Sequence, residues 1–301
     1  MKKRFFLILL LVLPSLLTGC AHQAVPAQIA ATTLPVYEFT TRLCEKTPVT
    51  VTRLVTEEVG CLHDYSLNVK QVKAAESAEL IVISGAGLEE FLDDILLDKQ
   101  TIDASHGIEL IVPKEHHHDH EAEHAHTGSD HEGHHHEQDP HIWLSPTNAR
   151  DMVFNIWEGL CEAYPNHAEQ FTENLWSLSD DLDALVAYGH RQLEDLSCRE
   201  LITFHDGFAY LADAFHLTIL DAIEEESGSE ASAKELIHII EEVEHHRLPA
   251  IFTEKSGSVS AAGIISRETG AKTFALDMAM AGDSWFDAMY YNIDTLKEAL
   301  G

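Results

Sequence analysis

The sequence predicts an α/β protein with two lobes, each built on a central, mostly parallel sheet flanked by helices, joined by one long rigid helix. Three observations support this prediction. Short β-rich segments alternate with helical patterns in the first half of the chain, the same alternation returns in the second half, and a long amphipathic stretch lies between the halves. Such alternation is typical of parallel sheets. Without a leader, about 280 residues are long for one domain and comfortable for two.

The first 19 residues have the pattern of an export signal. A basic start, Lys2 to Arg4, precedes the apolar stretch 5–17, which is too short to be read first as a membrane-spanning helix. The stretch ends in Leu-Thr-Gly-Cys20, which resembles the bacterial lipobox; two acyl chains on Cys20 would anchor the protein stably. We therefore expect a lipoprotein signal peptide at 1–19 and a lipid-anchored linker at 20–26. The alternative is an ordinary signal peptide in which this cysteine is coincidental.

The first lobe is expected at 27–164. Runs rich in β-branched residues predict strands at 49–55 and 79–85, and apolar spacing predicts helices at 68–78 and 87–97 and another from Thr147 onward.

A connecting helix is expected at 165–199, because the most regular helical pattern of the chain runs from about 166 to 197. The residues that keep one face apolar are Phe171, Leu175, Leu178, Leu182, Leu185, Leu193 and Leu196. Roughly 30 residues at 1.5 Å each span about 45 Å, more than one small lobe needs. A plain surface helix is the alternative. The position between two α/β halves favours a rigid connector that limits hinge bending.

The second lobe is expected at 200–301 and repeats the alternation of strands and helices. Its predicted strands are 201–204, 250–253 and 272–276, and its predicted helices are 206–215, 233–246 and 258–269. A closing helix has one apolar stripe, formed by Trp285, Met289, Ile293, Leu296 and Leu300.

Composition limits the partners. The formal net charge of −32 becomes −35 when the three cations of the leader are removed. No basic patch is available to meet phosphates, so the chain is not expected to bind nucleic acid. Four cysteines besides Cys20 permit two disulfides in an oxidising compartment. Proximity in the sequence favours Cys44 with Cys61 and Cys161 with Cys198.

A His-rich loop is predicted at 115–137. Ten histidines lie between residues 116 and 136, interleaved with Asp and Glu, and the segment has no periodic apolar face with which to build a core. Imidazole is the commonest protein ligand for zinc and related metals. Metal handling is therefore the first functional hypothesis, and a merely solvated acidic loop is the alternative.

Three further histidines and one acid stand in distinctive places. His63 lies in a loop after the first predicted strand, and His141 lies directly after the His-rich loop. His205 and Asp277 each follow a predicted strand. Ligands of parallel sheets collect beyond the carboxyl ends of strands, where these two should emerge. A single loop histidine is more often structural than a ligand, but four residues in matching contexts are stronger evidence together.

Several segments resemble the metal-specific class of solute-binding lipoproteins of ABC transporters. The segments are HDY at 63–65, DPHIWLSP at 139–146, HDGFAY at 205–210 and AGDSWFDAM at 281–289. They follow the order of that class over nearly the whole mature chain. The resemblance implies two α/β lobes joined by one long helix, with a metal cleft between the lobes. It implies that His63, His141 and His205 are metal ligands, and that Asp277 matches a carboxylate ligand of many members.

The resemblance also points to zinc. Manganese-specific relatives place a Glu where this chain has His205, and three imidazoles with at most one carboxylate suit Zn²⁺. Ligand chemistry alone leaves Cu²⁺ and Ni²⁺ open, and Asp277, Glu254 or a water are open for the fourth position. Asp139 and Asp206 adjoin ligands and either orient imidazoles or are solvated loop acids.

The implied function is extracytoplasmic capture of Zn²⁺ and its delivery to an ABC-transporter permease and its ATPase, by a monomer. No GxSxG motif indicates an enzyme, and the two HExxH matches, HEAEH at 120–124 and HEGHH at 131–135, lie within the predicted His-rich loop rather than on a predicted helix. Uptake of manganese or another divalent metal is one alternative, and a surface adhesin with a structural zinc is another.

Overall fold

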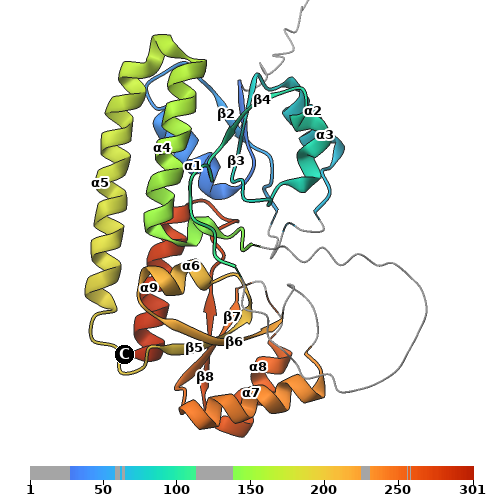
Figure 1. Ribbon diagram of the computed structural model, residues 1–301, viewed down its shortest axis with the longest axis vertical. Coiled ribbons are helices and arrows are strands. Elements are labelled where there is room, and N and C mark those ends of the chain that lie inside the picture. The colour runs from blue at the N-terminus through green and yellow to red at the C-terminus, as the bar shows by residue number, and fades with distance from the viewer. Residues whose placement is uncertain are drawn as a thin grey trace, which may run out of the picture.

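The computed structural model describes residues 28–57, 62, 65–112, 138–224, 231–255, 257 and 259–301. Figure 1 shows two α/β lobes, one above the other, with a long helix running beside both. This confirms the predicted fold class. Among the described residues, no helix combines the length and the apolar character that a membrane span requires. The predicted signal peptide, the linker at 20–26, the His-rich loop and His63 lie outside the described residues.

The sheet of the first lobe has four parallel strands in the order β2-β1-β3-β4. The strands are β1 (Ile29–Ala31), β2 (Val51–Arg53), β3 (Leu80–Ile83) and β4 (Gln100–Asp103). The helices of this lobe are α1 (Leu34–Leu43), α2 (Val69–Ser77) and the short α3 (Asp93–Leu96), and a 3-10 turn covers Glu90–Leu92. The strands β1 and β3 at the centre of the sheet are buried along almost all of their length, as expected for a parallel sheet covered on both faces.

The sheet of the second lobe is also parallel, in the order β6-β5-β7-β8. The strands are β5 (Glu200–His205), β6 (Thr218–Glu224), β7 (Ala250–Glu254) and β8 (Lys272–Leu276), and the helices are α6 (Ala209–Ala214), α7 (Ala233–His246), α8 (Ser260–Thr269) and α9 (Trp285–Leu300). All five residues predicted for the apolar stripe of the closing helix are buried. The order of the strands puts β7 between β5 and β8, which decides the geometry of the site below.

The lobes are connected by α4 (Pro146–Ala163) and α5 (Ala168–Gln192), which pack against each other. The 25 residues of α5 span about 37 Å. The helix ends at Gln192, earlier than the sequence predicts. Arg199 donates hydrogen bonds to the carbonyls of Leu193 (2.8 Å) and Glu194 (2.7 Å), so these carbonyls at the helix end are satisfied without a further turn.

The helix predicted at 87–97 forms only in part. Ala86 and Gly87 both have positive φ values, 55° and 81°, which no helix continues. Only the 3-10 turn and the single turn of α3 form there. The strands β1, β4 and β6 and the helix α1 were not predicted. β1 has three residues and β4 has four, too few to show a period in the sequence.

The disulfide predicted between Cys161 and Cys198 is wrong, because both are free thiols; Cys44 is also a free thiol, and Cys61, its predicted partner, lies outside the described residues. Cys161 lies in the last turn of α4, beside the start of α5, whereas Cys198 follows the other end of α5. The length of that helix, about 37 Å, far exceeds the roughly 7 Å between Cα atoms that a disulfide allows. Proximity in the sequence misled the prediction because a straight helix separates its ends.

Two fully buried tryptophans form hydrogen bonds that link the lobes. Trp143 donates from Nε1 to the carbonyl of Met278 (2.7 Å), and Trp285 donates from Nε1 to the carbonyl of Trp143 (3.1 Å). The segment after β8 is thereby tied to the segment that precedes α4. A continuous apolar core includes residues of both lobes, such as Val82 and Phe252. The junction is therefore a packed interior rather than a flexible hinge.

Candidate metal site

The candidate site lies at the carboxyl ends of the strands of the second lobe. His205 is the last residue of β5, Glu254 is the last residue of β7, and Asp277 follows β8 directly. His205 and Glu254 are almost completely buried, at 3% and 4% exposure. Parallel strands place these side chains on one edge of the sheet, which is the usual position for a ligand site in this architecture.

His141, from the first lobe, meets His205 at this edge. The Nε2 atoms of the two imidazoles are 3.4 Å apart, and the rings stand nearly perpendicular, at 88°. Two nitrogens bound to one tetrahedral Zn²⁺ at 2.0–2.1 Å lie about 3.3–3.4 Å apart. Both rings are buried, so the pair is spaced and enclosed as two ligands of a single tetrahedral ion would be.

Asp139 forms a hydrogen bond with the ring nitrogen of His141 that faces away from His205. Its Oδ1 accepts a hydrogen bond from Nδ1 of His141 (2.7 Å) and another from the backbone N–H of the same residue (2.9 Å). Because a carboxylate is an acceptor, Nδ1 carries the proton and the lone pair of Nε2 is directed toward His205. The orienting role suggested for Asp139 by the sequence is therefore supported by a direct contact.

Glu254 lies on the corresponding side of His205, at a longer distance. Its Oε1 lies 3.6 Å from Nδ1 of His205, within ion-pair range, while Nε2 of the same ring faces His141. Each of the two imidazoles thus has a buried carboxylate on its outer nitrogen and the other imidazole on its inner nitrogen. The hydrogen bond from His141 to Asp139 is the arrangement in which a carboxylate fixes the tautomer and the orientation of a metal-binding histidine, whereas the 3.6 Å between His205 and Glu254 is an ion-pair distance, longer than a hydrogen bond.

Gly207 lies against His205 and leaves room for its imidazole. The sequence did not reveal this role. A Cβ atom at position 207 would lie 2.6 Å from Cδ2 and 2.8 Å from Nε2 of His205, and 2.9 Å from the Cε of Met278. These distances are all shorter than a van der Waals contact. Only a residue without a side chain fits there unless the imidazole moves.

Asp277 is engaged by other groups. Its Oδ2 lies 2.9 Å from Nζ of Lys255, and its Oδ1 accepts a hydrogen bond from the backbone N–H of Ala279 (2.8 Å). Since β7 separates β8 from β5, Asp277 leaves the sheet about 10 Å, two strand spacings, from the strand of His205. Of the two acids considered for the fourth position, Glu254 is therefore the nearer to His205.

The described residues supply a pair of imidazoles rather than a complete set of ligands. Within the described ranges, no group of three or more His, Cys, Asp or Glu side chains is placed to hold a metal ion. His63, the third predicted ligand, lies outside them. Its role as a ligand, like that of Asp277, stays a prediction.

The segment that carries Asp139 is also tied to the second lobe. Tyr210 of α6 donates to the carbonyl of Asp139 (2.8 Å) and accepts from the backbone N–H of Ile111 (3.0 Å), and the backbone N–H of Asp139 donates to the carbonyl of Ile111 (2.8 Å). Burial raises the pKa of Tyr210 to about 12, so its hydroxyl stays protonated. These hydrogen bonds join Ile111, which precedes the His-rich segment, to Asp139, which follows it and lies two residues before His141.

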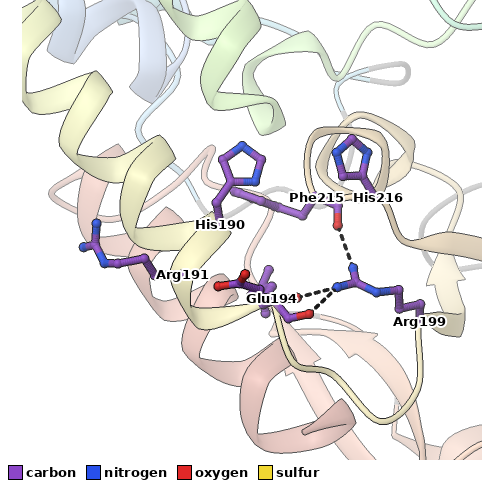
Figure 2. A pocket seen from close by; sticks show the side chains of 7 residues that line it. His190, Arg191, Glu194, Arg199, Phe215 and His216 are labelled. Carbon is purple, nitrogen blue, oxygen red and sulfur yellow. Dashed lines mark hydrogen bonds between the residues drawn. The ribbon is translucent and has the colours of Figure 1, made fainter.

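A cavity of about 360 Å³ lies elsewhere, where α5 ends against the turn after α6 (Figure 2). It is lined by His190, Arg191, Leu193, Glu194, Arg199, Phe215 and His216. None of these is a predicted ligand. The Arg199 guanidinium is already bound to carbonyls, including that of Phe215 at 3.3 Å. This cavity is therefore separate from the candidate metal site.

Two α/β lobes fastened along one long helix, with an imidazole from each lobe meeting at their junction, define a two-lobed metal-binding protein. The family model described as zinc-uptake complex component A, periplasmic (ZnuA), matches residues 29–299, and the chain belongs to this family. Members of the family are binding components of uptake systems rather than enzymes. The resemblance read from the sequence is confirmed.

Individual relatives agree with this assignment. The chain is 30% identical to the zinc-binding lipoprotein AdcA of Streptococcus pneumoniae over 98% of its own length, but it spans only 61% of that relative. A crystal structure of ZnuA aligns with a TM-score of 0.75 and 27% identity, covering 91% of this chain and 100% of that one. The protein FpvC of Pseudomonas aeruginosa, solved in complex with Mn²⁺, aligns with a TM-score of 0.74 at 21% identity, covering 90% of this chain and 97% of that one, and shows the fold alone.

Proposed function

We propose that this protein captures Zn²⁺ outside the cytoplasm and delivers it to the permease of an ABC transporter. His63, His141 and His205 would bind the ion through their imidazoles, and Asp277 would occupy the fourth position. The observation that carries the proposal is the pair of buried Nε2 atoms 3.4 Å apart, each imidazole backed by a buried carboxylate. Asp139 and Glu254 would orient the ligands rather than bind the metal.

Ligand chemistry supports zinc as the cargo. Imidazole nitrogens suit Zn²⁺, whereas Mn²⁺ depends more on carboxylate and water oxygens. The relative from Streptococcus pneumoniae is named for zinc binding, although the fold also occurs in a structure that holds Mn²⁺. Uptake of manganese or another divalent metal is the alternative that a direct comparison of affinities would decide.

The proposed activity is capture and release, without bond-making. The energy for transport would come from the ATPase partner of the permease. Membership of an uptake-complex family supports the permease as partner and an extracytoplasmic location. Attachment to the membrane through lipid on Cys20 and a monomeric state complete the proposal. Adhesion to a surface, the other function considered from the sequence, stays a prediction that a binding assay with extracellular-matrix proteins would test.

The His-rich segment is proposed to bind further zinc ions weakly and to raise their concentration near the site. A variant without residues 116–136 tests this. Because the backbone N–H of Asp139 already bonds to the carbonyl of Ile111, the flanks of the segment are held together in the rest of the fold. The expected result is loss of the weak sites and retention of one tight site. Loss of the tight site would contradict the assignment.

The decisive test is zinc binding by the His205→Ala variant. With a competing chelator present, so that only tight binding is counted, we expect one zinc per wild-type chain and none per variant chain. His190→Ala is the matched control, because this histidine is exposed and lies on α5 away from the site. One tightly bound zinc in the His205→Ala variant would overturn the proposal.

A further inference from the structure

Lys255 occupies a position that the proposed metal site does not explain. It directly follows Glu254 at the end of β7, and its Nζ lies 2.9 Å from Oδ2 of Asp277. The same ammonium stands 3.6 Å from the centre of the Tyr291 ring, a distance at which a cation is attracted to the aromatic face. The Tyr291 hydroxyl donates to the carbonyl of Ala275 (3.0 Å), which fixes the ring beneath the lysine.

The backbone brings Lys255 to Asp277. The N–H of Lys255 donates to the carbonyl of Leu276 (2.9 Å), which extends the parallel ladder of β7 and β8 by one more bond. The two side chains leave neighbouring strands at the same level of the sheet. Their contact is therefore built into the pairing of these strands and does not depend on a chance approach of two surface side chains.

The backbone and the carboxylate of Asp277 are also held by other groups. Asn292, which is fully buried, accepts a hydrogen bond from the backbone N–H of Asp277 and donates one to its carbonyl, both at 2.7 Å. The backbone N–H of Ala279 donates to Oδ1. With Lys255 on Oδ2, both carboxylate oxygens have partners. A metal ion that took Asp277 as a ligand would compete with the Lys255 ammonium for Oδ2 and would be repelled by its like charge, and the side chain of this lysine is partly exposed, at 46%.

We propose that Lys255 is a specificity-determining residue that disfavours Mn²⁺ by competing with the metal for the carboxylate of Asp277. This inference rests on the proposed function. A site with three imidazoles already satisfies most of the preference of Zn²⁺, whereas Mn²⁺ gains more from carboxylate oxygen. Holding Asp277 with an ammonium therefore costs Mn²⁺ more affinity than it costs Zn²⁺.

The test compares the affinities of the full chain for Mn²⁺ and for Zn²⁺ in the wild type and in Lys255→Gln. The ion pair of Lys255 is partly exposed and has one aromatic contact, so removing it changes metal affinity only modestly. We expect the affinity for Mn²⁺ relative to Zn²⁺ to rise about five- to tenfold. Lys272→Gln is the matched control, because Lys272 is exposed at the opposite end of β8 and its removal changes the net charge by the same amount. This control is expected to leave the ratio unchanged.

A double-mutant cycle shows whether Lys255 acts through Asp277. In an Asp277→Asn background, Lys255→Gln is expected to leave the Mn²⁺ to Zn²⁺ ratio unchanged. An unchanged ratio in the single variant, an equal shift in Lys272→Gln, or a shift that persists in the Asp277→Asn background would each overturn the inference. The proposed function fails on a different result, retention of tight zinc by His205→Ala, so the two failures are distinguishable. Thermal melting of each metal-free variant confirms that it is folded.

Discussion

Gly207→Ala is the substitution that most directly tests the geometry of the imidazole pair. The added methyl group would lie 2.6 Å from Cδ2 and 2.8 Å from Nε2 of His205. Ordinary contacts begin at about 3.4 Å, so the ring must move by roughly 0.6–0.8 Å. Gly207 does not have a positive φ, so alanine brings no backbone strain of its own and the effect is confined to the crowded imidazole.

The size of this displacement sets the expected loss of affinity. Metal–ligand distances tolerate about 0.2 Å, and disturbing the surroundings of a ligand typically costs 10–100-fold in metal affinity. We expect zinc affinity at the tight site to fall by about 10–100-fold. Crowding a buried site typically costs about 1–3 kcal/mol, so the metal-free variant should be somewhat less stable but still folded, with the methyl of Met278 moving aside.

Competition with a chelator measures the affinity, and thermal melting with and without zinc provides a second measure. Gly263→Ala is the control, because a methyl group in helix α8 would meet only an Arg267 nitrogen at 3.5 Å. Alanine in a helix interior is favoured over glycine by about 0.8–1.0 kcal/mol, so this variant should melt at a slightly higher temperature with unchanged zinc affinity. Wild-type zinc affinity in Gly207→Ala would refute the placement of the metal at Nε2 of His205.

Two further predictions concern buried acids. Asp139→Asn keeps an acceptor for the imidazole of His141 but removes the charge, so zinc affinity measured by chelator competition should fall about tenfold; an unchanged affinity would show that the carboxylate does not tune the ligand. Burial raises the pKa of Glu89 to about 7, even though Thr32, Ser84 and Gly85 donate hydrogen bonds to it. The folded protein therefore binds this proton more tightly than the unfolded chain, and the stability that the proton contributes is present below pH 4.5 and lost as pH rises through 7. Between those limits the wild type should lose up to about 3 kcal/mol more than Glu89→Gln in urea unfolding, and parallel pH profiles of the two proteins would contradict this.

Patterns within single segments predicted much of the fold. Helix α7 forms over the predicted residues 233–246 because its apolar residues have helical spacing and because Ser232 and Glu235 form a capping box at its start. The apolar stripe of α9 is buried as its spacing indicates. Such patterns lie within a single segment, so they can be recognised without knowing which other segments pack against it. Where the local signal is short, as in β1 and β4, the element was missed.

The placement of His205 and Asp277 at strand ends was also predictable, because residues that follow parallel strands emerge at one edge of a sheet. The order of the strands within that sheet was not. Since β7 lies between β5 and β8, Glu254 rather than Asp277 stands next to His205, and Lys255 meets Asp277. The disulfide prediction failed for a related reason, because nearness along the chain says little once a long helix intervenes.

By itself, the sequence determined the class of this protein, two parallel α/β lobes on a long helix with histidines at their edges, because hydrophobic periodicity and strand-end positions are properties of single segments. Only the tertiary structure decided which groups meet: the two Nε2 atoms at 3.4 Å, the carboxylates behind them and the space left by Gly207. Those contacts join residues as far apart in the chain as His141 and His205, and they depend on how the lobes pack. The packing of both lobes into one core, rather than any local preference, brings these residues together.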